Sequence, residues 1–208
     1  MSGCGCDRET TQSLERRTLL ILLWINAVMF VLEATAGSIA DSTGLMADSL
    51  DMLADASVYG IALYAVGRSP LTQFRAGAAS GYLQVTLGAG VLVDVVRRFA
   101  YGSDPVSAMM MVVGGMALAA NVACLVLLSR HRDGGMHMRA SWIFSTNDVI
   151  ANASVIVSGL LVAILASRIP DLVIGLAIAV VVIRGGIRIL QEARERRPSV
   201  SADVNVGA

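Results

Sequence analysis

Long apolar stretches alternate along this chain with short connections that are polar or contain glycine and proline. Six stretches have about the 20 residues that a helix needs to cross a bilayer. We predict them at residues 18–36, 44–66, 76–99, 106–128, 141–166 and 172–190. The connections between them are too short to hold a further domain. The pattern predicts an all-α membrane protein with six transmembrane helices.

The same pattern divides the chain into three parts. Residues 1–17 form a polar N-terminal tail, residues 18–190 the transmembrane domain, and residues 191–208 a short polar C-terminal tail. Composition agrees with this division, because the mean hydropathy is +0.68 and only 15% of residues are charged. Soluble domains usually contain about 25% charged residues. The three cysteines do not make an even framework of paired bridges, so we do not expect a disulfide scaffold.

The distribution of positive charge predicts the orientation of the chain. All 16 basic residues are arginines, and most of them fall on one side of the predicted membrane. This side carries Arg8, Arg16, Arg17, Arg68, Arg75, Arg130, Arg132, Arg139, Arg188, Arg194, Arg196 and Arg197. Because arginine-rich connections stay in the cytoplasm, we predict that both termini are cytoplasmic. The location that follows is the bacterial inner membrane, crossed several times.

A row of acids lies inside the second apolar stretch. Asp48, Asp51 and Asp55 are spaced i, i+3 and i+7, which places the three carboxylates on one face of a helix. Each charged side chain at the centre of a membrane helix costs roughly 2.5–3.5 kcal/mol on insertion scales. A bound divalent cation would offset that cost. Asp48 also has a simpler interpretation, because an acid near a helix N-terminus is favourable by itself.

Oxygen-bearing side chains also occur inside the first and fifth stretches. Asp148 and Asn152 are one turn apart, Ser145 and Asn147 precede them, and Glu33 lies in the first stretch. Divalent ions, including Zn²⁺, accept such oxygen ligands. We therefore predict a metal site made by Asp51, Asp55 and Asp148. Asp48, Glu33, Ser145, Asn147 and Asn152 are possible further ligands or members of a proton path.

Several of these polar residues have a simpler interpretation, which stays open at this point. Lone polar residues in membrane proteins often form hydrogen bonds between helices and have no other role. This interpretation applies to Asn26, Asn121, Asn152 and Glu33. Asp94 lies beside Arg97 and Arg98, and we expect a local ion pair there.

Three residues outside the apolar stretches could guide metal to the site. Cys4 and Cys6 could capture a soft metal ion, although two thiolates make an incomplete site. His137, at the cytoplasmic end of the fifth stretch, could lead metal inward or could simply be solvated.

The acid motifs resemble those of a known family of transporters. The segment from Gly44 to Asp55 is similar to the second helix of the cation diffusion facilitator family, in which an [HD]xxxD pair binds metal. The segment from Met138 to Asn152 resembles the fifth helix of that family, which carries a second such pair. The resemblance extends over all six stretches. It implies a secondary transporter that exports divalent metal from the cytoplasm in exchange for protons.

The physical chemistry of the acids is compatible with that exchange. Carboxylates clustered away from water repel one another, so they hold protons when the metal has left. Zn²⁺ is the commonest cargo of the resembled family and the one we expect, with Cd²⁺, Co²⁺, Fe²⁺ and Mn²⁺ as alternatives. Two other functions stay open: a passive channel for divalent metal, and an intramembrane aspartyl protease. The protease lacks support, because its GxGD and YD signatures are missing.

The chain departs from the family pattern in two places. Phe144 occupies a position where most members have His or Asp, so the fourth ligand is left undetermined. The family usually adds a cytoplasmic metal-binding domain, and only residues 191–208 follow the last stretch here. We therefore expect a short form without that domain, and a homodimer held by transmembrane helices. Gly88, Gly90, Gly114 and Gly115 would allow the helices of two subunits to approach closely.

Overall fold

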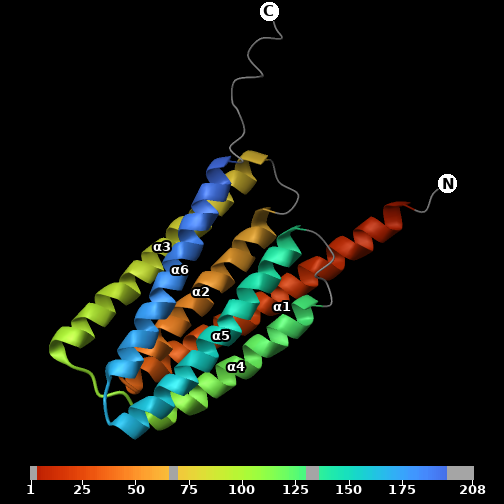
Figure 1. Cartoon of the computed structure of the whole chain (residues 1–208). Helices are drawn as coiled ribbons and strands as arrows, with labels where there is room; N and C mark the ends of the chain where they lie inside the picture. Colours follow the sequence, from red (N-terminus) through yellow and green to blue (C-terminus); the bar gives the residue numbers. More distant parts are fainter. Residues whose placement is uncertain (1–3, 66–69, 130–135, 196–208) are drawn as a thin grey trace, which may run out of the picture.

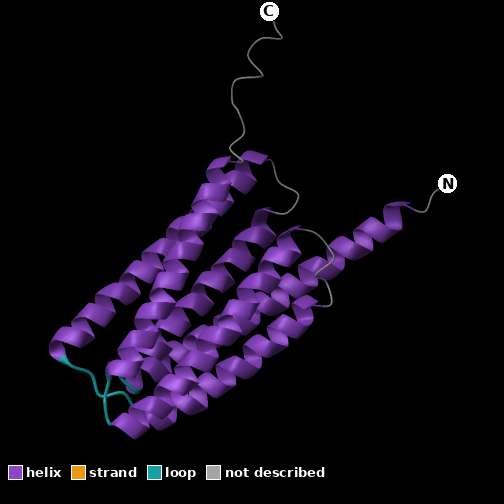
Figure 2. Ribbon diagram, viewed as in Figure 1, coloured by secondary structure: helices purple, strands orange, loops and turns teal. Residues whose placement is uncertain are grey.

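The structure, a computed structural model, describes the backbone of residues 4–65, 70–129 and 136–195. Side chains are described for residues 16–61, 63–64, 71–72, 74–127, 129 and 148–194. All regular secondary structure within these ranges is helical, as Figure 2 shows. The six helices are α1 (Cys4–Ile39), α2 (Thr43–Ala65), α3 (Pro70–Tyr101), α4 (Ser107–Ser129), α5 (Met136–Leu165) and α6 (Ile169–Glu195).

Each predicted stretch corresponds to one helix, but several helices are longer than predicted. α3 begins at Pro70 instead of residue 76, and α6 continues to Glu195 instead of ending at residue 190. α1 begins at Cys4, so most of the predicted N-terminal tail has a helical backbone. Hydropathy locates the apolar part of a helix, whereas the hydrogen-bonded backbone continues into polar residues with good helix propensity.

Five of the six helices are long and apolar enough to cross a membrane. The segments within them are Arg16–Ile39, Phe74–Tyr101, Ser107–Leu127, Asp148–Leu165 and Ile169–Arg194. α2 is not among them, and it is the helix that carries Asp48, Asp51 and Asp55. This 23-residue helix nevertheless contacts all five of the other helices.

The helices form an up-and-down bundle with α2 near its centre (Figure 1). α3 packs along α6, α1 along α2, and α4 along α5, while α2 also contacts α3, α6, α5 and α4. The described ends of α1 and α6 that are nearest the chain termini lie at the same end of the bundle (Figure 1). The main apolar core includes Leu45, Val91, Met110, Val155 and Val182, one residue from each of α2 to α6. Large apolar side chains such as Trp24 and Val93 point outward, as expected for a surface that faces lipid.

Two of the four glycines predicted to allow dimer contacts are used within the subunit instead. A Cβ atom on Gly88 would lie 2.5 Å from Ile183 Cγ1 of α6. A Cβ atom on Gly114 would lie 3.2 Å from Ile156 Cγ1 of α5. These two glycines let neighbouring helices of one chain pack closely. The expectation that all four serve a dimer interface is therefore wrong for Gly88 and Gly114, whereas Gly90 and Gly115 have open space around them.

Candidate metal centre

Three aspartates from two helices line one cavity inside the bundle. Asp51 and Asp55 of α2 and Asp148 of α5 face a space of about 220 Å³, which is completed by side chains of α3 and α6. Asp48 lies on the same side of α2, because it shares a narrower gap with these three aspartates. The i, i+3 and i+7 spacing therefore brings the carboxylates of α2 to one face, opposite Asp148.

The carboxyl groups of Asp55 and Asp148 lie within hydrogen-bonding range of each other. This contact joins α2 to α5 at the cavity.

A second pair of acids lies deeper in the bundle. Glu33 of α1 is completely buried, and its carboxyl group is in contact with that of Asp48, which is 1% exposed. Among the described residues, neither Glu33 oxygen nor Asp48 Oδ2 accepts a hydrogen bond from a donor. The acidic face of α2 therefore continues from the cavity to α1.

The structure brings the predicted ligands together without closing a shell around an ion. In the part of the chain whose side chains are described, no three His, Cys, Asp or Glu side chains are arranged to hold a metal ion. The arrangement is one of facing acids beside an open space. The role of Asp51, Asp55 and Asp148 as ligands stays a prediction.

Neutral amides border the acids. Asn26 of α1 and Asn121 of α4 share the narrow gap with the aspartates. Asn26 and Asn152 each donate a hydrogen bond to a carbonyl of their own helix, at 2.9 and 2.8 Å, and their Oδ1 atoms have no partner among the described residues. Their described hydrogen bonds thus lie within one helix and do not connect two helices, contrary to the simpler interpretation.

The remaining predicted residues lie outside the described side chains. Ser145, Asn147, His137 and Phe144 are on the backbone of α5, and Cys4 and Cys6 are on that of α1. Their predicted roles therefore stay untested.

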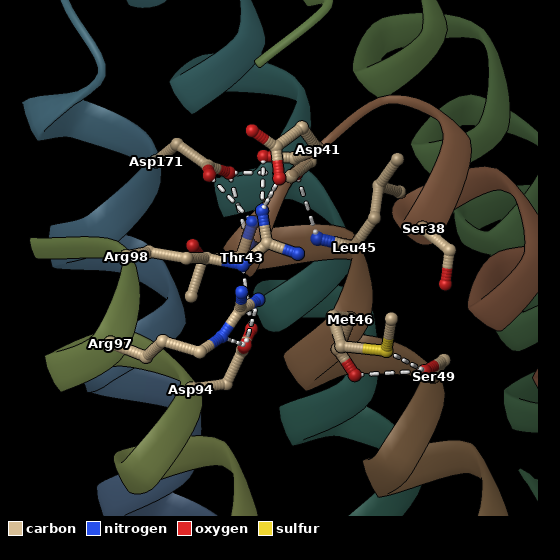
Figure 3. A network of polar contacts seen from close by, with 12 residues as sticks. Ser38, Asp41, Thr43, Leu45, Met46, Ser49, Asp94, Arg97, Arg98 and Asp171 are labelled. Atoms are coloured by element: carbon tan, nitrogen blue, oxygen red, sulfur yellow. Dashed lines mark hydrogen bonds and ion pairs between the residues drawn. The ribbon is translucent and has the colours of Figure 1, made fainter. Parts of the chain in front are cut away.

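The helix that carries the acids is fixed at its N-terminus by a residue from α6. Asp171, which is completely buried, accepts hydrogen bonds from the backbone N–H groups of Thr43 (2.6 Å) and Gly44 (2.9 Å) and from the hydroxyl of Ser42 (2.7 Å). The same hydroxyl accepts a hydrogen bond from the N–H of Leu45 at 3.2 Å. The first three N–H groups of α2, which have no partner within the helix, are thus all satisfied (Figure 3).

The turn before α2 is also held from α3. The Arg98 side chain, which is 5% exposed, pairs with Asp94 at 2.6 Å and with the carboxylate of Asp41, and it donates to the Asp41 carbonyl oxygen at 2.6 Å. Asp41 has a φ of 49°, a conformation that aspartate tolerates better than most residues. Arg97 pairs with Asp94 at 2.7 Å (Figure 3), which confirms the expected local ion pair. No local sequence pattern indicates the contact with Asp41, which is 57 residues away from Arg98.

The fold and its acidic interior define a class of protein: a helical membrane protein with a charged cavity enclosed by its helices. A family model described as the cation efflux transmembrane domain matches residues 19–196. The chain belongs to the cation efflux family. This match confirms the resemblance that the motifs of the second and fifth helices indicated.

Curated relatives of the chain are named as metal transporters or as metal tolerance proteins. The zinc transporter ZitB of Yersinia pseudotuberculosis is 24% identical over 199 residues, which cover 88% of this chain and 63% of that protein. The metal tolerance protein A2 of Arabidopsis thaliana is 28% identical over 145 residues, which cover 60% and 37%. A cadmium, cobalt and zinc/H(+)-K(+) antiporter of Bacillus velezensis is 18% identical over 192 residues, which cover 86% and 61%. The chain spans less than two thirds of the length of these relatives.

Proposed function

We propose that this protein is a secondary transporter that exports a divalent transition metal from the cytoplasm in exchange for protons. The observation that carries this proposal is that Asp51, Asp55 and Asp148 line one cavity within a bundle of apolar helices. Carboxylates at this depth are unfavourable without a counter-charge, and a divalent cation supplies one. Membership of the cation efflux family supports the same class of cargo.

Zn²⁺ is the cargo we propose. Carboxylate oxygens bind Zn²⁺, and the relatives named as zinc transporters support this choice. The same oxygens also suit harder ions such as Mn²⁺. Cd²⁺, Co²⁺, Fe²⁺ and Mn²⁺ are therefore the alternatives that a transport assay must include.

Proton exchange is supported by the contact between Asp55 and Asp148. The two carboxyl groups lie close together, so in the absence of metal we propose that they share a proton. Bound metal would displace that proton because metal and proton compete for the same oxygens. Metal affinity should therefore fall as the pH falls. Glu33 and Asp48 extend the acidic face and are candidates for the proton path.

We propose that all six helices, α2 included, cross the bacterial inner membrane, with both termini in the cytoplasm. The arginine distribution supports this orientation. The 220 Å³ cavity extends from the aspartates to Arg184 and Arg188, toward the C-terminal end of α6. In this orientation the cavity lies on the cytoplasmic side of the acids, where exported metal enters.

We further propose a homodimer formed through transmembrane helices. Gly90 of α3 and Gly115 of α4 support it, because no atom lies within 4 Å of a Cβ placed on either residue. Small residues with free space beside them are typical of surfaces at which membrane helices of two subunits meet.

A transport assay with purified protein in liposomes separates the candidate functions. A proton gradient directed outward, with the liposome interior more acidic than the medium, should drive Zn²⁺ uptake. An imposed Zn²⁺ gradient should in turn change the internal pH. A passive channel would move Zn²⁺ without any pH change. An intramembrane protease would cleave a membrane peptide and move no metal. Zn²⁺ movement that is independent of the pH gradient would contradict the proposed exchange.

A further inference from the structure

A buried amide of α3 faces the cavity that contains the three aspartates. Gln84 is 5% exposed and lines the 220 Å³ cavity together with Asp51, Asp55 and Asp148. Its Oε1 atom is buried and has no hydrogen-bond partner in the described part of the chain. A buried amide oxygen without a partner is unfavourable, and a cation in the cavity would satisfy it.

Close packing between α3 and α6 fixes the position of this amide. A Cβ atom on Gly185 of α6 would lie 3.1 Å from Gln84 Nε2. One turn away, a Cβ atom on Gly81 would lie 2.7 Å from Leu190 Cγ and 3.0 Å from the carbonyl oxygen of Gly186. The two helices therefore pack closely through their backbones beside the Gln84 side chain.

The cavity has room for an ion that still carries water. Its volume of about 220 Å³ equals that of roughly seven water molecules at about 30 Å³ each. Arg184 and Arg188 also line it, and the Arg188 guanidinium pairs with Glu192 at 3.1 Å. Among these residues, Gln84 adds an oxygen donor without adding charge.

We propose that Gln84 supplies a neutral oxygen ligand to the divalent ion in this cavity and helps to determine which metal is accepted. This inference rests on the proposed transport function and names a ligand on α3, in addition to those on α2 and α5. An amide oxygen is a hard donor, so it favours ions such as Mn²⁺ and Zn²⁺ over the softer Cd²⁺. Because the amide stays neutral, it binds metal without competing for protons.

Replacement of Gln84 by methionine tests this role. Met has nearly the same length, but it exchanges the hard oxygen for a soft sulfur. Gln84→Met should weaken Mn²⁺ binding by about tenfold and affect Cd²⁺ less, so that the ratio of the two affinities shifts toward Cd²⁺. Binding is measured by calorimetry on purified full-length protein with each metal alone. An unchanged ratio in folded protein would overturn the proposal, because a purely structural role would not discriminate between metals.

Two further variants keep the test decisive. Thr86→Val on the same helix is the matched control, because the Thr86 side chain is exposed and its hydroxyl donates to the Tyr82 carbonyl. This control should leave the ratio of the Mn²⁺ and Cd²⁺ affinities unchanged.

Should Gln84→Met fail to fold, Gln84→Glu keeps the length and the oxygen and adds a charge. That variant should bind Mn²⁺ more tightly, with a steeper dependence on pH. Unchanged binding by folded Gln84→Glu would overturn the proposal.

Failure of this inference and failure of the proposed function give different results. If Asp51→Asn binds metal as the wild type does, the proposed function fails, whatever the Gln84 variants do. If Asp51→Asn loses binding while Gln84→Met keeps the wild-type ratio, only the role of Gln84 is wrong.

Discussion

At the scale of single residues, the charged and amide side chains inside the bundle fall into two groups. Those with satisfied hydrogen bonds, such as Asp171 and Arg98, hold helices together. Those with unpaired oxygens, such as Glu33 and Gln84, lie beside the cavity or along the acidic face of α2. Buried polar atoms are normally paired, so the unpaired oxygens beside the cavity are compatible with the proposed binding of a cation there.

The first prediction concerns Phe144, where the chain departs most from the family motif. Phe144 and Asp148 are one helical turn apart, so Phe144→His would place a nitrogen donor near the site. Nitrogen suits Zn²⁺ better than Mn²⁺, and the ratio of the two affinities should rise in favour of Zn²⁺. Calorimetry with each metal measures this ratio. An unchanged ratio would mean that residue 144 does not face the metal.

At the scale of helices, the contacts that hold the site are densest at the N-terminus of α2, where side chains cap the helix. Ser42 and Asp171 satisfy the three free N–H groups of its first turn. These capping contacts fix the rotation of α2 about its axis and its position along the bundle. They therefore set the direction in which Asp48, Asp51 and Asp55 point.

The second prediction is that Asp171→Ala destabilises the protein through α2. The substitution leaves the N–H groups of Thr43 and Gly44 buried without an acceptor, which should cost about 1–3 kcal/mol in unfolding free energy. Asp171→Asn keeps one acceptor oxygen and should cost less. Thermal unfolding in detergent compares the three proteins. Equal stability of Asp171→Ala and wild type would show that capping of the α2 N-terminus by Asp171 contributes little to the unfolding free energy.

The third prediction compares two adjacent arginines of α3. Arg98→Gln removes a guanidinium that connects Asp94 and Asp41 inside the protein, and this should lower the unfolding free energy by about 2 kcal/mol. Arg97→Gln removes an exposed guanidinium whose ion pair, among the described residues, is with Asp94 of its own helix. Stability should therefore stay near that of the wild type. Chemical unfolding of the two variants measures the difference. A larger loss for Arg97→Gln would contradict the role assigned to Arg98.

The helices and the acidic face of α2 could be predicted from the sequence, whereas most of the contacts between helices that hold them in place could not. Hydropathy indicates each helix because every one has an apolar middle, and the spacing of Asp51 and Asp55 determines their common face. Asp171 and Gln84 were not predicted as contacts, and for Arg98 only the local pair with Asp94 was predicted. The other contacts depend on partners or packing from elsewhere in the chain. Such contacts arise only when the bundle packs, and no local pattern encodes them.

At the scale of the whole molecule, the glycines divide between packing inside the subunit and free surface. Gly88 and Gly114 let α3 approach α6 and let α4 approach α5. Gly90 and Gly115 have no neighbours within 4 Å of an added Cβ and remain available for a second subunit.

The fourth prediction uses this division to test the proposed dimer. Gly115→Leu should weaken association of the subunits while leaving each of them folded, because the added side chain enters open space. Gly88→Leu is a control in which the added side chain enters the packed interior of one subunit. It should destabilise the subunit itself, since a Cβ atom placed on Gly88 would lie 2.5 Å from Ile183 Cγ1. Crosslinking in lipid bilayers measures association. Unchanged crosslinking of Gly115→Leu and of Gly90→Leu would exclude these positions from the interface.

The central claim is that Asp51, Asp55 and Asp148 bind the transported metal, and one measurement tests it most directly. Zn²⁺ uptake into liposomes is driven by a pH gradient and compared for wild-type protein and the three single Asp→Asn variants, at equal protein content. Each variant keeps the size of the side chain but loses the charge and the proton-carrying group. We predict that each loses transport while remaining folded in the membrane. Transport by Asp148→Asn at the wild-type rate would contradict the account.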